Sequence, residues 1–368
     1  MSGQVTLYVW SFALAFLFAM SATQLAIRLA HRFKILDVPG GRRKHARPIP
    51  RPGGVAIFAA FGLAIAVFWT IDVLSGGPVL IPEEVRSPRF RLVVLAAIVS
   101  VLVGFFDDLV DLRARWQLLG QLVVAAIVVA AGVRIEFVNN PLVPAHVLVL
   151  GGLAVPLTFL WIVGMINALN FIDGLDGLAA GVSAIAAVCL GFIALTPNIN
   201  EPFVAWMEFA LAGALIGFLI FNVHPAKLFL GTSGVTFVGT VLATLSIFGT
   251  AKVAAALLVL GVPIIDTFYV IVRRLFERRP PFAPDRGHFH HRLLDVGLSH
   301  TRAVFLIYVI TALLGAIALL ASGQAQVLAF AAVFIALGVA ALVLAQRSAK
   351  AQEYESGLYA DGEESQRA

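Results

Sequence analysis

Long apolar stretches recur along the chain and are separated by short polar segments. A membrane-spanning helix needs roughly 17 to 25 mostly apolar residues, and about eleven stretches approach or reach that length. Only Gly249, Thr250 and Lys252 separate the eighth stretch from the ninth, so ten spans remain an alternative if this region forms one bent or re-entrant segment. We predict spans at residues 5–30, 53–74, 90–106, 116–133, 147–166, 176–196, 204–221, 235–248, 251–273, 303–321 and 325–346.

The composition supports a membrane protein, because 60% of the residues are hydrophobic and only 13% are charged. Such a chain is too apolar for a soluble globular domain. We therefore expect an all-α polytopic membrane protein. One integral-membrane domain is predicted over residues 1–346, followed by a polar, disordered cytoplasmic tail over residues 347–368.

The distribution of basic residues predicts the orientation, because cytoplasmic loops retain Lys and Arg. Basic residues concentrate between the first two predicted spans, over residues 32–51, and again over residues 273–302. Alternation of the spans then places the N-terminus outside and the C-terminus inside. The net charge of +5 follows from these loops, and no basic patch interleaved with aromatic residues indicates nucleic-acid binding.

Polar clusters interrupt the apolar pattern at predicted cytoplasmic ends of spans. Asp107, Asp108 and Asp111 lie within about one helical turn, where mutual repulsion favours a divalent cation or a cationic partner. A solvated helix end, with Arg113 and Arg115 as counter-charges, is the alternative. Ionisable groups at a membrane edge are usually functional, so we favour the cation-binding interpretation.

Three further segments combine glycine, hydroxyl, amide, carboxylate or imidazole groups. Residues 167–177 (NALNFIDGLDG) contain amides suited to a base or sugar, and glycines that allow phosphate to approach the backbone. Residues 231–234 (GTSG) open the eighth span and predict either a simple N-cap or an anion contact. His288, His290 and His291 beside Arg286 predict phosphate capture, proton transfer or a metal site.

Together these motifs resemble the polyprenyl-phosphate N-acetylhexosamine-1-phosphate transferases, which are related to phospho-MurNAc-pentapeptide transferase. The matching stretches are residues 37–54 (DVPGGRRKHARPIPRPGG), 107–108 (DD), 167–179 (NALNFIDGLDGLA), 261–274 (GVPIIDTFYVIVRR) and 282–293 (FAPDRGHFHHRL). The resemblance implies transfer of HexNAc-1-phosphate, with GlcNAc favoured, from a UDP-sugar to undecaprenyl phosphate, releasing UMP. It also implies a Mg²⁺ cofactor, with Mn²⁺ as the alternative, and a role in priming cell-envelope polysaccharide. The resemblance further implies that the cytoplasmic loops are catalytic and that the protein lies in the inner membrane of a bacterial cell.

The resemblance assigns roles to individual residues. The implied catalytic residues are Asp107, Asp108, His290 and His291. The implied substrate-binding residues are Lys44, His45, Asn170, Asp173, Asp176, Arg286 and His288. The implied metal ligands are Asp108 and Asp173, with Thr232 at the position where the family has an aspartate.

Thr232 is the clearest departure from the family pattern, because a neutral hydroxyl replaces a carboxylate. Three interpretations are open: weaker metal binding with retained activity, metal held by the other aspartates, or a substrate-binding pseudoenzyme. The DDxxD pattern of residues 107–111 also fits membrane prenyltransferases, and phospho-MurNAc-pentapeptide transferase remains an alternative activity. A transporter is disfavoured because its polar residues would gather at the midplane. A homodimer is compatible with all of these interpretations.

Overall fold

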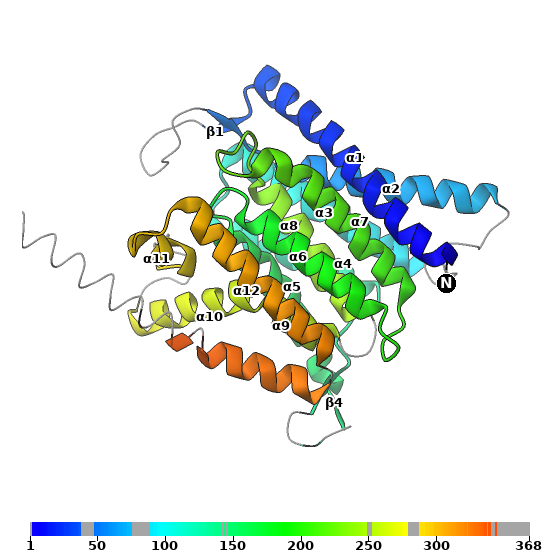
Figure 1. Cartoon of the computed structure of the whole chain (residues 1–368), viewed down its shortest axis with the longest axis vertical. Helices are drawn as coiled ribbons and strands as arrows, with labels where there is room; N and C mark the ends of the chain where they lie inside the picture. The colour runs from blue at the N-terminus through cyan, green and yellow to red at the C-terminus, as the bar shows by residue number, and fades with distance from the viewer. Residues whose placement is uncertain are drawn as a thin grey trace, which may run out of the picture.

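The computed structural model describes residues 2–37, 48–75, 88–140, 143, 146–248, 252–278, 287–321, 323–336, 338, 339 and 343. These residues are almost entirely helical, as expected for an all-α polytopic protein (Figure 1). Two short antiparallel hairpins are the exception: β1 (Leu36–Asp37) pairs with β2 (Ile49–Pro50), and β3 (Phe137–Asn139) pairs with β4 (Val147–Val149). The hydropathy pattern did not predict either hairpin.

Apart from the short helix at Phe289–Asp295, the helices follow the predicted apolar stretches. They are α1 (Ser2–Phe33), α2 (Gly53–Leu74), α3 (Pro88–Val110), α4 (Ala114–Ala130), η2 (Gly151–Leu153), α5 (Ala154–Ile172), α6 (Leu178–Ala194), α7 (Pro202–Asn222), α8 (Gly231–Ile247), α9 (Lys252–Val259), α10 (Gly261–Phe276), α11 (Phe289–Asp295) and α12 (His300–Leu320). A further apolar helix covers Gln324–Ala336.

Among the described residues, 6 helices are long and apolar enough to cross a membrane, and the bent pair α9–α10 raises the number to 7. Four shorter apolar helices, at Ala114–Ala130, Leu178–Ala194, Gly231–Ile247 and Gln324–Ala336, occupy other predicted spans. The multi-pass helical fold is thus confirmed, whereas the number of spans stays a prediction. The tail over residues 347–368 lies outside the described residues.

Two boundaries differ from the prediction. The span predicted at 251–273 is bent, because α9 and α10 meet at Leu260 at an angle of 80°. The fifth span was placed at 147–166, but residues 147–149 form β4 and α5 continues to Ile172. Asn167 and Asn170 therefore lie in the last turns of a helix, and only Asp173 onward forms the turn to α6.

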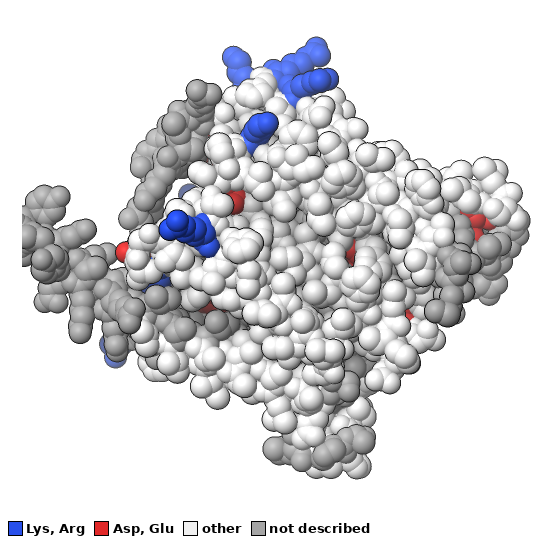
Figure 2. All heavy atoms as spheres, viewed as in Figure 1, with Lys and Arg blue, Asp and Glu red and all other residues white. Residues whose placement is uncertain are grey.

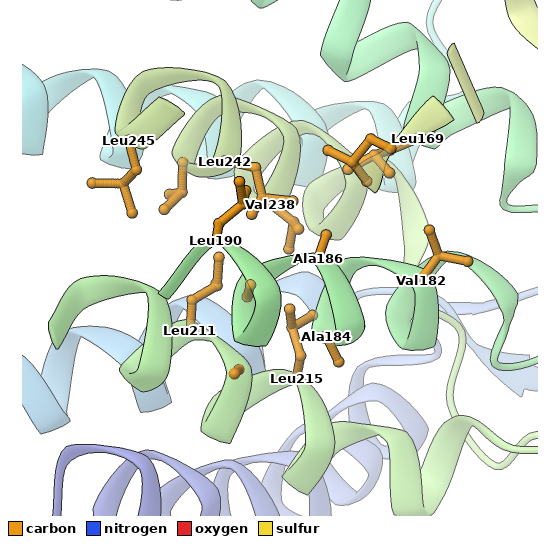
Figure 3. Packing of buried hydrophobic residues seen from close by; sticks show 14 of the residues in the cluster. Leu169, Val182, Ala184, Ala186, Leu190, Leu211, Leu215, Val238, Leu242 and Leu245 are labelled. Atoms are coloured by element: carbon orange, nitrogen blue, oxygen red, sulfur yellow. The ribbon is translucent and has the colours of Figure 1, made fainter. Parts of the chain in front are cut away.

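The innermost helices are α6, α7 and α8, which are rich in small side chains. Figure 3 shows Leu190 of α6 between Leu211 of α7 and Leu242 of α8, and all three are almost completely buried. Alanine and glycine along these helices let the backbones approach closely, which is how helices associate in lipid, where burial from water contributes little. The outermost apolar side chains, such as Phe276 and Leu320, are instead exposed at 85% and 88%.

The charged side chains are distributed unevenly over the surface. Figure 2 shows a face that is almost free of charge, with Lys and Arg gathered toward the end where α1 finishes and α12 begins. This pattern fits an apolar belt in contact with lipid and a polar end in contact with water. The N-terminus lies at the opposite end of α1.

Helices α1 and α7 pack closely because two glycines of α7 face the backbone of α1. A Cβ at Gly213 would overlap the backbone oxygen of Phe12, and a Cβ at Gly217 would press against the backbone oxygen of Phe16. Because backbone atoms cannot move aside as flexible side chains can, a larger residue at either position must push the helices apart.

We predict that Gly213→Val lowers the melting temperature of the detergent-purified protein by several degrees, since overpacking of a core costs about 1–3 kcal/mol. Gly62→Val on α2 is the matched control, because a Cβ at Gly62 meets no atom within 4 Å. Equal melting temperatures for the two variants, measured by thermal denaturation, would contradict the close α1–α7 packing.

Candidate active site

Four polar segments meet at one end of the helix bundle. They are the end of α3, the turn between α5 and α6, the start of α8, and α11 with the residue before it. The prediction that these clusters face one common site is therefore consistent with the direct contacts described below. In Figure 1, α11 lies beside the start of α12, far from the N-terminus.

Asp108 joins the end of α3 to the start of α8. Its two carboxylate oxygens accept hydrogen bonds from the backbone N–H groups of Thr232, at 2.8 Å, and Ser233, at 3.0 Å. Both N–H groups lie at a helix N-terminus, so they have no acceptor within the helix, and a negative charge is favoured there. Gly231 is required here, because its φ is +71° and a Cβ would press against both Asp108 oxygens and the backbone oxygen of Arg51.

Asp107 and Asp111 fix the chain that leaves α3. Asp107 is buried and accepts hydrogen bonds from the backbone N–H of Leu112, at 2.8 Å, and from Gln117 Nε2, at 2.9 Å. Asp111 is mostly exposed and pairs with Arg51 at 2.6 Å. The guanidinium of Arg51 also reaches Asp37 at 2.8 Å, so Arg51 ties the first hairpin to the site. The three clustered aspartates thus have three different partners.

The turn between α5 and α6 is held by residues from two distant segments. Asp176 Oδ2 lies 2.7 Å from His224 Nδ1 and accepts a bond from the backbone N–H of Ala226 at 3.1 Å. His300 Nε2 lies 3.3 Å from the backbone oxygen of Asp176, and the His224 and His300 rings stack at 4.1 Å. The sequence interpretation missed both histidines. Asn222 and His224, two polar residues directly after an apolar span, could have indicated that this segment contributes to the site.

Gly177 completes this turn. It adopts a left-handed conformation, with φ of +81°, directly before α6. Its N–H donates to Asn222 Oδ1 at 3.1 Å, and its carbonyl accepts from Tyr308 Oη at 2.5 Å. The turn is therefore fixed by backbone contacts to α7 and α12, and the carboxylates on either side of it are held in place.

His290 packs directly against this turn. A Cβ at Gly174 would overlap Nε2 of His290, so only glycine lets the imidazole lie so close to the backbone. His290 is 1% exposed, and neither ring nitrogen has a hydrogen-bond partner among the described residues. Burial, followed by the nearby His291, His288 and His300, lowers the pKa of His290 well below its ordinary value. A neutral imidazole with two unpartnered nitrogens is prepared for a ligand.

The carboxylate of Asp173 lies near two other acids. Burial, and then the charges of Asp108 and Asp176, raise its pKa to about 7. Like charges held together in this way are relieved by a cation. Carboxylate oxygens are also the donors that Mg²⁺ prefers, so Asp108 and Asp173 fit a hard divalent cation, with Thr232 beside Asp108.

A second group of possible ligand atoms lies next to this one. One ligand atom each from Asp176, His224 and His300 lies within 4.8 Å of the others. Two imidazoles and one carboxylate suit zinc-like metals better than Mg²⁺. The existing contacts of Asp176 with both histidines already account for this arrangement as a support for the turn.

Of the remaining residues predicted to belong to the site, some lie at it, one supports the helix packing, and three lie outside the described residues. Asn170 is half-buried in the last turn of α5, and His291 lies with its ring 4.2 Å from that of His290. Asn167, which we expected to face a base or sugar, donates instead to Gln121 Oε1 at 2.7 Å and links α5 to α4. The predicted substrate contacts Lys44, His45 and Arg286 lie outside the described residues.

Comparison with known proteins gives a consistent result. The model of glycosyl transferase family 4 matches residues 90–250, which include Asp107, Asp108, the α5–α6 turn and the start of α8. A probable undecaprenyl-phosphate N-acetylglucosaminyl 1-phosphate transferase of Bacillus subtilis is 35% identical over 82% of this chain and 81% of its own. A decaprenyl-phosphate N-acetylglucosaminephosphotransferase of Mycobacterium leprae is 35% identical over 78% and 77%. An undecaprenyl-phosphate alpha-N-acetylglucosaminyl 1-phosphate transferase of Thermotoga maritima is 33% identical over 71% and 74%.

We predict that Gly174→Ala abolishes most of the enzymatic activity, because the new methyl group displaces the His290 ring from the turn. Gly164→Ala, in the middle of α5, is the control, since a Cβ there meets no atom within 4 Å. Both variants should reach the membrane in normal amounts, as measured by immunoblotting. Activity equal to that of the control in Gly174→Ala would contradict the proposed position of His290.

The raised pKa of Asp173 predicts a pH-dependent stability. The folded state binds this proton more tightly than the unfolded state, whose pKa is near the ordinary 3.8. The stabilising contribution is therefore complete below pH 3.8 and is lost as the pH rises through about 7. In EDTA, we expect the melting temperature of the wild type to fall relative to that of Asp173→Asn between about pH 5 and pH 8.

Added Mg²⁺ should remove most of that difference, because a bound cation favours the ionised carboxylates. Thermal denaturation across this pH range, with and without Mg²⁺, provides the measurement. Parallel curves for the two proteins at every pH would show that the three acids do not repel one another as described.

Proposed function

Because the chain belongs to glycosyl transferase family 4, as its relatives of 35% identity over most of its length show, we propose that it is a prenyl-phosphate N-acetylglucosamine-1-phosphate transferase. In this reaction the phosphate of a polyprenyl lipid attacks the β-phosphorus of UDP-GlcNAc. The bond between the β-phosphorus and the bridging oxygen breaks, that oxygen leaves on the α-phosphate of UMP, and a prenyl-diphosphate sugar forms.

One observation carries this proposal. The carboxylates of Asp108 and Asp176 lie close enough to Asp173 to raise its pKa, and the neutral, unpartnered imidazole of His290 packs against the same turn at one end of an apolar helix bundle. Both substrates are anions, and one of them is a lipid. A site that needs a cation and lies at the edge of the lipid layer suits such a pair of substrates.

A divalent cation, with Mg²⁺ favoured and Mn²⁺ as the alternative, would be held by Asp108 and Asp173 and would neutralise the diphosphate when bound. The second pKa of a phosphate monoester is about 6, so at neutral pH the lipid phosphate is already largely a nucleophilic dianion. The protein therefore supplies mainly positioning and charge compensation.

The side chains of the site divide this task. Asp108 fixes the start of α8, where the helix dipole favours negative charge. Asp107 orders the turn after α3 through Leu112 and Gln117 and so supports Asp108. His290, being neutral, accepts or donates hydrogen bonds without adding charge, and His291 lies beside it for contact with the transferred group.

Asp173, Asp176 and Asn170 line the end of α5 and the following turn, where we place the nucleotide-sugar. Arg286, His288, Lys44 and His45 complete the predicted contacts to the sugar nucleotide and the lipid phosphate. The names of the relatives favour GlcNAc over a phospho-MurNAc-pentapeptide. We further propose that the site faces the cytoplasm of a bacterial cell, with the N-terminus outside and the C-terminus inside, because the described basic residues Arg51, Arg274 and Arg292 lie beside the site.

Thr232 is compatible with this activity, because its neighbours Asp108 and Asp173 remain available to a cation. We predict that Thr232→Asp lowers the Mg²⁺ concentration needed for half-maximal UMP release by about tenfold, which corresponds to about 1.4 kcal/mol of binding. The added negative charge is the reason. Thr232→Asn, of similar size but uncharged, is the control and should leave the Mg²⁺ dependence close to that of the wild type.

The measurement is UMP release in membranes supplied with polyprenyl phosphate, UDP-GlcNAc and a series of Mg²⁺ concentrations. UDP-GalNAc and UDP-MurNAc-pentapeptide serve as competing donors. No transfer by the wild type or by Thr232→Asp with any donor would favour a substrate-binding pseudoenzyme. An unchanged Mg²⁺ dependence in Thr232→Asp would remove the start of α8 from the metal site.

A further inference from the structure

Asp266 is a buried acid on α10 to which the proposed reaction gives no role. Its Oδ2 lies 2.9 Å from Nδ1 of His288, and its Oδ1 accepts the backbone N–H of Phe289 at 2.8 Å. The side chains of Asp266 and His288 are both only 7% exposed. Both carboxylate oxygens are thus used to hold the residue before α11 and the first residue of that helix.

The bend between α9 and α10 makes this contact geometrically accessible. After the 80° change of direction at Leu260, the buried face of α10 carries Asp266 toward the histidine segment, while Phe268 on the other face is exposed. A carboxylate placed in an apolar helix is costly unless it is paired. The pair with His288 supplies that partner, which the sequence alone did not reveal.

The contact also determines which nitrogen of His288 carries the proton. A carboxylate only accepts hydrogen bonds, so Nδ1 must be the donor, and in the neutral ring Nε2 then carries the lone pair. The ring lies 5.4 Å from that of Phe171 and 5.8 Å from that of His290, between the end of α5 and the candidate site. Its orientation is therefore fixed from three sides.

We propose that Asp266 is a positioning residue, which holds His288 in the Nδ1–H tautomer so that Nε2 accepts a hydrogen bond from the sugar nucleotide. The inference rests on the proposed function, because it assigns His288 to the nucleotide-sugar. Asp266 itself does not touch the substrate and acts only through His288. Carboxylate partners of this kind set the tautomer and orientation of functional histidines in other sites.

Asp266→Asn separates positioning from simple structural support. The amide oxygen of asparagine still accepts the Phe289 N–H, so the start of α11 stays attached. The amide nitrogen, however, donates toward His288 Nδ1 and drives the ring proton to Nε2. We expect kcat/KM for UDP-GlcNAc to fall about 10- to 100-fold, the range seen when the partner of a functional histidine is removed.

Two further measurements distinguish this role from a loss of stability. In a His288→Ala background, Asp266→Asn should cause no further loss, because the two residues act as one unit. In ¹⁵N spectra of histidine-labelled protein, the signals that His288→Ala removes should indicate Nδ1–H in the wild type and Nε2–H in Asp266→Asn. Thr267→Val, a change at the neighbouring buried position, is the control and should keep its activity.

Wild-type kinetics in Asp266→Asn, an equal additional loss in the His288→Ala background, or an unchanged tautomer would each overturn the inference. If the wild type itself transfers no sugar phosphate, the proposed function fails. The tautomer measurement still tests the Asp266–His288 contact in that case, so the two failures are distinguishable.

Discussion

The carboxylate of Asp108 is the contact on which the rest of the site depends. Backbone N–H groups at a buried helix end have no water to bind and must find an acceptor within the protein. Asp108 supplies both acceptors for Thr232 and Ser233, and this fixes the end of α3 against the start of α8. Gly231 permits that approach because of its positive φ and its missing side chain.

Charge compensation follows from the same arrangement. Asp108 brings a negative charge near Asp173, whose pKa is raised to about 7, while the adjacent His290 is kept neutral by burial. The described part of the site therefore brings three carboxylates, those of Asp108, Asp173 and Asp176, close to the turn after α5. Such a site is incomplete without a cation, and two anionic substrates add to that requirement. Metal binding and substrate binding should consequently depend on each other.

Hydropathy and residue spacing predicted the helical bundle and the clusters that form the site. They did not predict the bend at Leu260, because the apolar pattern runs through it, although Gly261 and Pro263 beside it are helix-breaking residues. The contacts of Asp176 with His224 and His300 join residues 48 and 124 positions apart, a relation that only the fold creates. Asn167 illustrates the converse error, since a polar side chain that looked suited to a ligand joins two helices instead.

Transfer of a phosphorylated sugar, rather than of the sugar alone, is the central claim of this account. It is tested most directly with UDP-GlcNAc labelled with ³²P at the β-phosphorus, incubated with the purified protein, polyprenyl phosphate and Mg²⁺. The account predicts that the label moves into the lipid fraction while unlabelled UMP is released in equal amount. Label that remains in UDP, or a lipid fraction that stays unlabelled while UDP-GlcNAc is consumed, would contradict it.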